Sequence, residues 1–173
     1  MNQHSFAPVL LVAAALLAST SVARAAEPAP TRGGSTAVPK VLRPLKCAAL
    51  VPSELIAKHF AGMSMTEEAF MPGAVTCDLT GPKAFAILNV VCVAFDDARF
   101  RQSSLEQARA STDGKDLAGV GRAAYRGGPG HTGAVQFWDD DTNCLASLNV
   151  TSGDPTPAAI DLVRSINPTT VGP

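Results

Sequence analysis

Four cysteines constrain the fold of this chain more than any other feature, because a disulfide joins only positions that the fold brings close together. They are Cys47, Cys77, Cys92 and Cys144. No two of them form a Cys-x-x-Cys pair, which argues against a zinc site and against a thioredoxin-like redox motif. An even number of cysteines in an exported chain predicts two disulfides.

The amino terminus indicates export. Residues 9–17 form a run of Val, Leu and Ala that is too short to span a bilayer as a helix. The small-x-small pattern Ala23-Arg24-Ala25 follows, as signal peptidase requires. We therefore expect residues 1–25 to be a signal peptide rather than a membrane anchor. The mature chain, with no membrane span, is expected in the periplasm or outside the cell.

A single domain is expected after this leader. Residues 26–44 are rich in Pro, Gly, Ser and Thr and have no apolar period, which predicts a disordered tether. The domain is expected over residues 45–168, with a short tail at 169–173. The formal net charge of the whole chain is −1, and its charges form no run. Neither nucleic acid nor a membrane surface is therefore expected as a partner.

Residues 116–150 predict a glycine turn followed by a hairpin. Gly119 and Gly121 precede a short strand near Tyr125. Residues 134–138 and 144–150 then form two strands around a polar turn. Alternate residues of the last strand predict one buried face: Cys144, Ala146, Leu148 and Val150.

An earlier hairpin is predicted around the turn Thr80-Gly81-Pro82-Lys83. Its first strand, residues 75–79, turns Val75, Cys77 and Leu79 inward. Its second strand, residues 84–95, is apolar on both sides, which favours a central position in the sheet. The methionine-rich residues 63–71 before this hairpin are expected to form an apolar loop that fills gaps in the core.

Three helices complete the expected elements. The first covers residues 52–61 and can end at Gly62 in a left-handed conformation. The second begins at one of two overlapping capping boxes and runs to about Ser111 with a weak apolar stripe. The two capping boxes are Ser103 with Glu106 and Ser104 with Gln107, and the apolar stripe consists of Leu105 and Ala108. The third covers residues 157–166, with Thr156 as its cap and Ile160, Val163 and Ile166 as its stripe.

These elements predict an α+β fold with the order α-β-β-α-β-β-α. Antiparallel strands with helices packed on one side form a two-layer domain, which two disulfides would staple. Folding the first hairpin places Cys77 opposite about Ala86, so Cys92 lies on the order of 20 Å away. That distance excludes a Cys77–Cys92 bond. Two pairings remain, and we favour Cys47 with Cys77 and Cys92 with Cys144.

Three features form a recognisable pattern: Cys47 before a Leu50-to-Leu55 helix start, Cys77 in a short strand, and the stretch Leu117-Ala-Gly-Val-Gly-Arg-Ala-Ala-Tyr125. This pattern, which spans about residues 45–167, resembles a group of small secreted bacterial proteins of unknown function, many of them lipoproteins. Their fold is similar to that of the extracellular sensor domain of mycobacterial PknH-type kinases. This chain lacks the lipid-carrying cysteine, and the resemblance supplies no catalytic residues.

Three motifs were weighed as cofactor or metal sites. Gly119-x-Gly121-x-x-Ala124 matches a dinucleotide fingerprint, but here the glycines precede a strand instead of following one. The turn at Asp139-x-Asp141-x-Asn143 resembles the start of a calcium loop without its glycine, so a solvated hairpin turn is expected. His59 is a candidate ligand or base, although a half-buried histidine with one hydrogen bond is expected instead. No metal or cofactor is therefore expected.

The loop at residues 126–133 is the candidate for contact with a partner. Four glycines and a proline there bury little apolar surface, while Arg126 and His131 offer hydrogen bonds. The competing interpretation is a permissive connector.

We expect an exported, non-catalytic envelope protein that binds a ligand or a partner such as another envelope protein. The alternative is a periplasmic immunity or inhibitor protein against a toxin or hydrolase. No acid–base or nucleophile cluster is visible in the sequence, so an enzyme is not expected.

Overall fold

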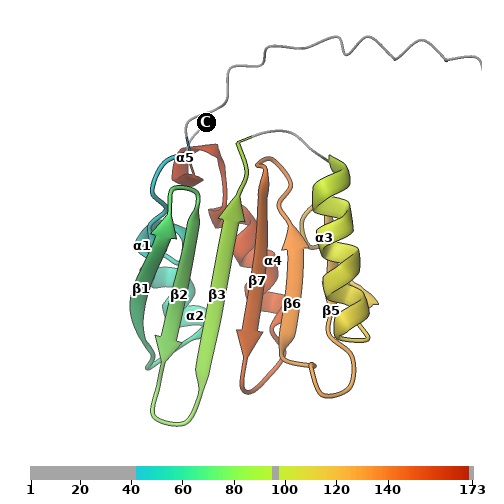
Figure 1. Cartoon of the computed structure of the whole chain (residues 1–173). Coiled ribbons are helices and arrows are strands. Elements are labelled where there is room, and N and C mark those ends of the chain that lie inside the picture. The colour runs from blue at the N-terminus through green and yellow to red at the C-terminus, as the bar shows by residue number, and fades with distance from the viewer. Residues whose placement is uncertain (1–41, 95–97, 172–173) are drawn as a thin grey trace, which may run out of the picture. The chain divides into compact units, whose positions relative to one another are not determined.

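The computed structural model describes residues 42–94 and 98–171. It confirms the α+β class, with one seven-stranded antiparallel sheet of order β1-β2-β3-β7-β6-β5-β4 (Figure 1). The strands are β1 (Ser64–Met71), β2 (Ala74–Thr80), β3 (Phe85–Cys92), β4 (Lys115–Asp116), β5 (Ala123–Arg126), β6 (Ala134–Trp138) and β7 (Cys144–Val150). The helices are α1 (Cys47–Leu50), α2 (Ser53–His59), α3 (Ala98–Ser111), α4 (Thr156–Ser165) and α5 (Pro168–Val171). The predicted signal peptide and most of the predicted tether lie outside the described residues.

The main core fills the space between one face of the sheet and four helices, α1, α2, α4 and α5. The strands contribute alternate residues, as the sequence predicted, and Phe137, Leu88 and Leu148 are fully buried. The helices contribute Leu50, Leu55, Ala159, Leu162 and Val171. Burying one such leucine or phenylalanine stabilises the fold by about 1.5–3 kcal/mol. This layer holds most of the packing energy of the domain.

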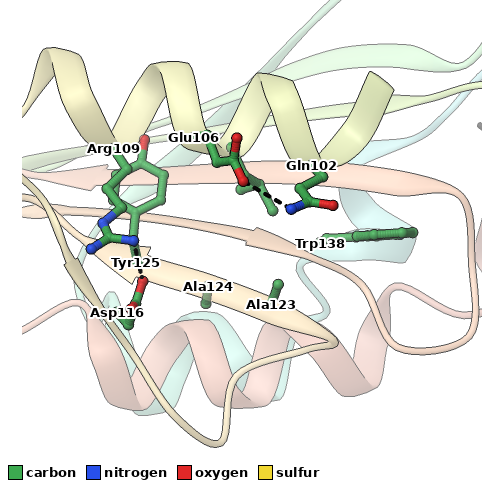
Figure 2. Close-up of a pocket in the computed structure, with 9 residues that line it drawn as sticks. Gln102, Glu106, Arg109, Asp116, Ala123, Ala124, Tyr125 and Trp138 are labelled. Atoms are coloured by element: carbon green, nitrogen blue, oxygen red, sulfur yellow. Dashed lines mark hydrogen bonds and ion pairs between the residues drawn. The ribbon is translucent and has the colours of Figure 1, made fainter. Parts of the chain in front are cut away.

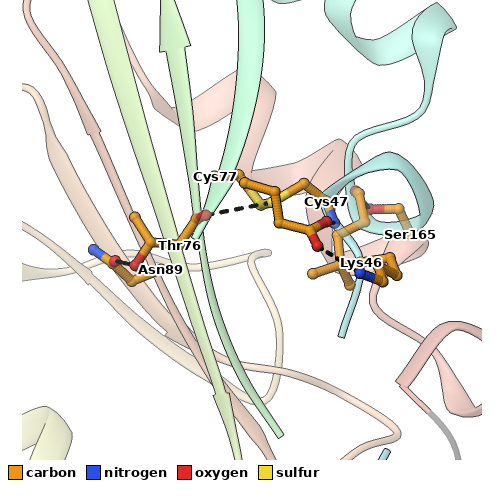
Figure 3. The surroundings of a disulfide bond; sticks show 8 residues. Lys46, Cys47, Thr76, Cys77, Asn89 and Ser165 are labelled. Atoms are coloured by element: carbon orange, nitrogen blue, oxygen red, sulfur yellow. Dashed lines mark hydrogen bonds and ion pairs between the residues drawn. A yellow bond between two sulfur atoms is a disulfide. The ribbon is translucent and has the colours of Figure 1, made fainter. Parts of the chain in front are cut away.

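Two disulfides connect the elements as predicted, Cys47 with Cys77 and Cys92 with Cys144. The first ties α1 to β2 (Figure 3). The second joins residues directly opposite each other on β3 and β7. Cys77 lies opposite Leu88, two residues from the predicted Ala86. Cys92 is still roughly 13 Å further along the strand, so the exclusion of a Cys77–Cys92 bond stands.

The sequence predicts a loop for the methionine-rich stretch, but this stretch forms the edge strand β1. Its inward position Glu67 is charged, which hides the alternation that identifies a strand. The Glu67 carboxylate accepts hydrogen bonds from the Lys46 ammonium and the Cys47 backbone N–H, both at 2.8 Å. A charge on an edge strand also discourages pairing with another chain.

The second predicted helix, α3, starts earlier than its capping boxes suggested. Ser103 and Ser104 lie inside the helix, where both hydroxyls donate to the Phe100 carbonyl. The helix also lies on the other face of the sheet from the remaining four (Figure 1). Its residue Leu105 packs on Tyr125 and Trp138, which point away from the main core. The expected layer of helices on one side therefore has one exception.

The domain extends past both predicted ends. At its start, Leu42 packs against the main core and the Arg43 carbonyl accepts a hydrogen bond from Gly73. At its end, Val171 is buried, so part of the predicted tail belongs to the core. The last long helix begins at Thr156 rather than being capped by it, and the Asp154 carboxylate accepts the Thr156 N–H at 2.9 Å.

Candidate functional site: a cavity beneath α3

A cavity of about 300 Å³ lies between α3 and the β5 end of the sheet. We call it the α3 cavity. It is lined by Gln102, Leu105, Glu106, Arg109, Asp116, Ala123, Ala124, Tyr125 and Trp138 (Figure 2). The cavity exists because β5 presents the small side chain of Ala123 to the helix, while the larger side chains of Tyr125 and Trp138 hold the helix off the sheet. The next residue, Ala124, lines the cavity from the strand but packs its side chain against the main core. Its size is at the lower end of the range for small-molecule sites.

The helix is attached to this face by a small second core. Leu105, Tyr125 and Trp138 form it, with Ala108 and Leu145 packed at its edge. The predicted stripe of Leu105 and Ala108 is therefore confirmed. Two helical residues bury much less apolar area than the main core does, so α3 is the most weakly packed long element among the described residues.

The indole of Trp138 is fixed by two arginines. The guanidinium carbon of Arg101 lies 4.2 Å from the ring centroid, and that of Arg122 lies 4.6 Å from it. Arg101 is fully buried, and an Arg122 Nη2 group donates to the Asp140 carbonyl at 2.6 Å. Cation–π contacts of this kind stabilise the ring position by about 0.5–2 kcal/mol each. The wall that Trp138 supplies is therefore preformed.

Two polar groups of the cavity wall are buried without satisfied hydrogen bonds. The Tyr125 hydroxyl and the Trp138 Nε1 group meet no partner at hydrogen-bonding geometry within the described part of the chain. Tyr125 is only 2% exposed and Trp138 only 7%. Burial raises the pKa of Tyr125 to about 12, and the nearby Thr112 hydroxyl offsets part of that rise. Unsatisfied buried groups of this kind are rare and cost about 1–3 kcal/mol each.

The rim of the cavity carries charged and amide side chains. The Gln102 amide donates to the Glu106 carboxylate at 2.9 Å. Arg109 pairs with Asp116 at 3.0 Å, and its Nε donates to the Gly114 carbonyl at 3.2 Å (Figure 2). Arg109 and Asp116 neutralise each other, whereas Glu106 has no cationic partner within the described residues. The rim is therefore net negative.

The open part of the sheet leads directly to this cavity. One row of paired residues crosses the sheet from the edge strand to the indole: Met71, Ala74, Val91, Leu145 and Trp138. Val91 is 48% exposed because no described helix covers β3 on this face. The neighbouring row is polar and ends at the phenol: Thr76, Asn89, Ser147, Gln136 and Tyr125. A ligand longer than the cavity could therefore continue along the sheet.

The predicted contact residues Arg126 and His131 lie outside the α3 cavity. Arg126 pairs with Asp154 at 3.2 Å and donates from Nε to the Thr132 carbonyl, also at 3.2 Å. His131 is exposed. Their role in binding a partner stays a prediction, because no contact in the structure tests it.

The glycines of this loop have a structural explanation. Gly127 and Gly128 are buried, and a Cβ atom on them would lie 2.3 Å and 2.2 Å from the carbonyl oxygens of His131 and Asp113. Close backbone packing therefore requires these two glycines. Their presence does not by itself indicate a binding function, contrary to the sequence argument.

His59 is a partly buried histidine with one hydrogen bond, as the sequence predicted. Its Nε2 is 2.7 Å from the Asp161 carboxylate, and its side chain is 13% exposed. Hydrogen bonds from His59 and Lys58 lower the pKa of Asp161 to about 2. This cluster joins α2 to α4 and lies away from the α3 cavity.

The turn at residues 139–143 is not the solvated turn that was predicted. Asp139 is fully buried, and its Oδ2 accepts hydrogen bonds from the Thr142 N–H at 3.0 Å and the Thr142 hydroxyl at 2.6 Å. Burial, assisted by the neighbouring Asp141 and partly offset by the hydrogen bonds from Thr142, raises the pKa of Asp139 to about 6. Within residues 42–94 and 98–171, no group of three or more His, Cys, Asp or Glu side chains could hold a metal ion.

Gly119 and Gly121 adopt positive φ angles of 79° and 57° in the turn before β5. They shape a turn, and a Cβ atom at Gly121 would lie 2.2 Å from the Trp138 carbonyl oxygen. The glycines therefore position the cavity wall, and their place before a strand does not match the order of a dinucleotide site.

Comparisons of the chain with known protein families, curated proteins and solved structures found no match. They neither support nor contradict the resemblance to PknH-type sensor domains. None of the described helices has the length and apolar character needed to cross a membrane. Two disulfides indicate an oxidising compartment outside the cytoplasm.

Proposed function

We propose that this chain is an exported, non-catalytic binding protein whose ligand occupies the α3 cavity. The observation that carries the proposal is a preformed cavity whose aromatic walls contain two buried polar groups that find no hydrogen-bond partner among the described residues. A ligand that supplies those partners would recover part of the free energy lost by burying them. The two disulfides support a compartment where the protein meets extracellular or periplasmic ligands.

The chemistry of the lining favours binding over catalysis. Its described residues include no histidine, serine or cysteine. Glu106 and Asp116 are both at the rim, where each already accepts a hydrogen bond or ion pair. No nucleophile stands beside a base, which is the arrangement that acyl or phosphoryl transfer would need.

The inhibitor alternative is less well supported. An inhibitor that blocks an active site commonly presents a protruding loop. The loop at residues 126–133 is instead tied to the body of the domain, because Gly127 and Gly128 donate their N–H groups to the carbonyls of Ala134 and Thr112.

The proposal can be tested through Trp138, which is the only tryptophan of the chain. Its indole N–H gives a single resonance in a ¹⁵N–¹H correlation spectrum, and that resonance reports on the cavity directly. We expect members of a small-molecule fragment library to shift it in a saturable manner. Ala123→Leu should abolish these shifts by filling the cavity, while Ala69→Leu on the exposed edge of β1 should leave them intact. A library that leaves the resonance unmoved, or equal binding to both variants, would refute the proposal.

A further inference from the structure

A local charge in the α3 cavity identifies the class of ligand, on the assumption that the proposed function is correct. We propose that the cavity binds a small organic cation, an amine with an apolar body, with Glu106 as the carboxylate that receives the ammonium group. Figure 2 shows Glu106 on α3, between Tyr125 and Trp138 along the helix, with Ala123 of β5 across the cavity.

Glu106 is a carboxylate of the cavity lining that has no cationic partner within the described residues. Its carboxylate is oriented by a neutral donor, the Gln102 amide, at 2.9 Å. The nearby cation Arg109 is already engaged by the Asp116 carboxylate and the Gly114 carbonyl. An anionic ligand would have to displace Asp116 and would meet repulsion from Glu106. A cationic ligand would leave the Arg109–Asp116 pair in place and would be attracted by Glu106.

A second hollow next to the cavity adds negative charge. It has a volume of about 340 Å³ and shares Glu106 and Arg109 with the α3 cavity, and it is also lined by Ala110, Asp113 and Gly114. The two adjoining hollows therefore carry three carboxylates, on Glu106, Asp113 and Asp116, against one guanidinium. The guanidinium groups of Arg101 and Arg122, 4.2 Å and 4.6 Å from the Trp138 ring centroid, line neither hollow. The preference for a cation therefore rests on the local contact with Glu106 and not on the net charge around the cavity.

The interior of the cavity complements the rest of such a ligand. Leu105 and Ala123 present apolar surface to the body of the molecule. Tyr125 points its hydroxyl toward α3 (Figure 2), and this buried group meets no partner at hydrogen-bonding geometry within residues 42–94 and 98–171. Its oxygen can accept a hydrogen bond from an ammonium group, which has three donors. The ligand therefore gains a charge partner at the rim and a hydrogen-bond partner at the wall.

Three probes of similar shape and different charge test this inference: 2-phenylethylammonium, 2-phenylethanol and 3-phenylpropanoate. We expect the cation to shift the Trp138 indole resonance at the lowest concentration, with an affinity at least three-fold higher than that of the alcohol. The anion should bind most weakly. Glu106→Gln keeps the hydrogen bond to Gln102 possible and should remove the preference for the cation over the alcohol. Glu68→Gln, which removes one carboxylate from the edge strand β1, should preserve it.

The outcomes separate this inference from the function on which it rests. Binding of the alcohol or the anion at least as tightly as the cation would overturn the inference and leave the cavity as a ligand site. The same holds if Glu106→Gln keeps the full preference for the cation. Absence of any shift by all three probes up to about 10 mM would count against both the inference and the proposed function.

Discussion

Replacing Asp139 by asparagine should stabilise the protein at neutral pH, although it removes a side chain that makes two hydrogen bonds. Burial raises the pKa of this carboxyl group from 3.8 to about 6. The folded chain therefore holds the Asp139 proton more tightly than the unfolded chain does. The contribution of this group to the free energy of unfolding is largest below pH 4, falls as the pH rises toward 6, and is level above that.

The size of the effect follows from that rise in pKa. At about 1.4 kcal/mol for each tenfold change in proton affinity, the ionised carboxylate destabilises the fold by at most roughly 3 kcal/mol above pH 6. In Asp139→Asn the amide oxygen can still accept the N–H and hydroxyl of Thr142, as Oδ2 does now. The amide NH₂ would occupy the position of Oδ1, which has no partner in the described part of the chain, at a cost of about 1 kcal/mol. We therefore expect a net gain of about 1–2 kcal/mol at pH 8.

Urea unfolding of the disulfide-intact protein between pH 4 and pH 8 measures this change. The difference between Asp139→Asn and the wild type should grow from pH 4 to pH 6 and then stay constant. Asp140→Asn, in the same turn but exposed, is the matched control and should change the stability by less than about 0.5 kcal/mol. A variant that is less stable than the wild type by the same amount at every pH would show that the buried carboxylate is not the destabilising charge we infer.

Two other predictions concern covalent structure. Replacing both Cys92 and Cys144 by alanine should lower the free energy of unfolding by about 2–4 kcal/mol, because the bond closes a loop with a sequence separation of 52 residues; a loss below about 0.5 kcal/mol in urea unfolding would contradict this. Mass spectrometry of the exported protein should find its amino terminus at Ala26 or Glu27, and recovery of a chain that starts at Met1 from the membrane fraction would overturn the predicted signal peptide.

The parts of the fold that the sequence predicted are those with a regular pattern facing the main core. The alternation around Cys77 and around Cys144 identified both hairpins, and the register they imply was close enough to select the disulfide pairing. Edge strand β1 was not predicted because its inward residue Glu67 is charged. The Glu67 carboxylate accepts hydrogen bonds from Lys46 and Cys47, which only the folded chain brings near it. Hydrophobic alternation alone does not identify an inward-facing charged residue when the partners that satisfy its charge are distant in the sequence.

The α3 cavity could not be predicted from any motif, because it depends on where a helix with a two-residue stripe docks. Its position was nevertheless signalled by Trp138. This residue alternates with the inward Val135 and Phe137, so it must point to the face that the pattern assigns to solvent. A tryptophan buries a large area in folded proteins, and a strand with large apolar side chains on both faces requires cover on both. Leu105 supplies that cover, and the small side chain of Ala123 on β5 leaves the space beside it empty. The residue that indicates the second layer therefore also forms one wall of the α3 cavity.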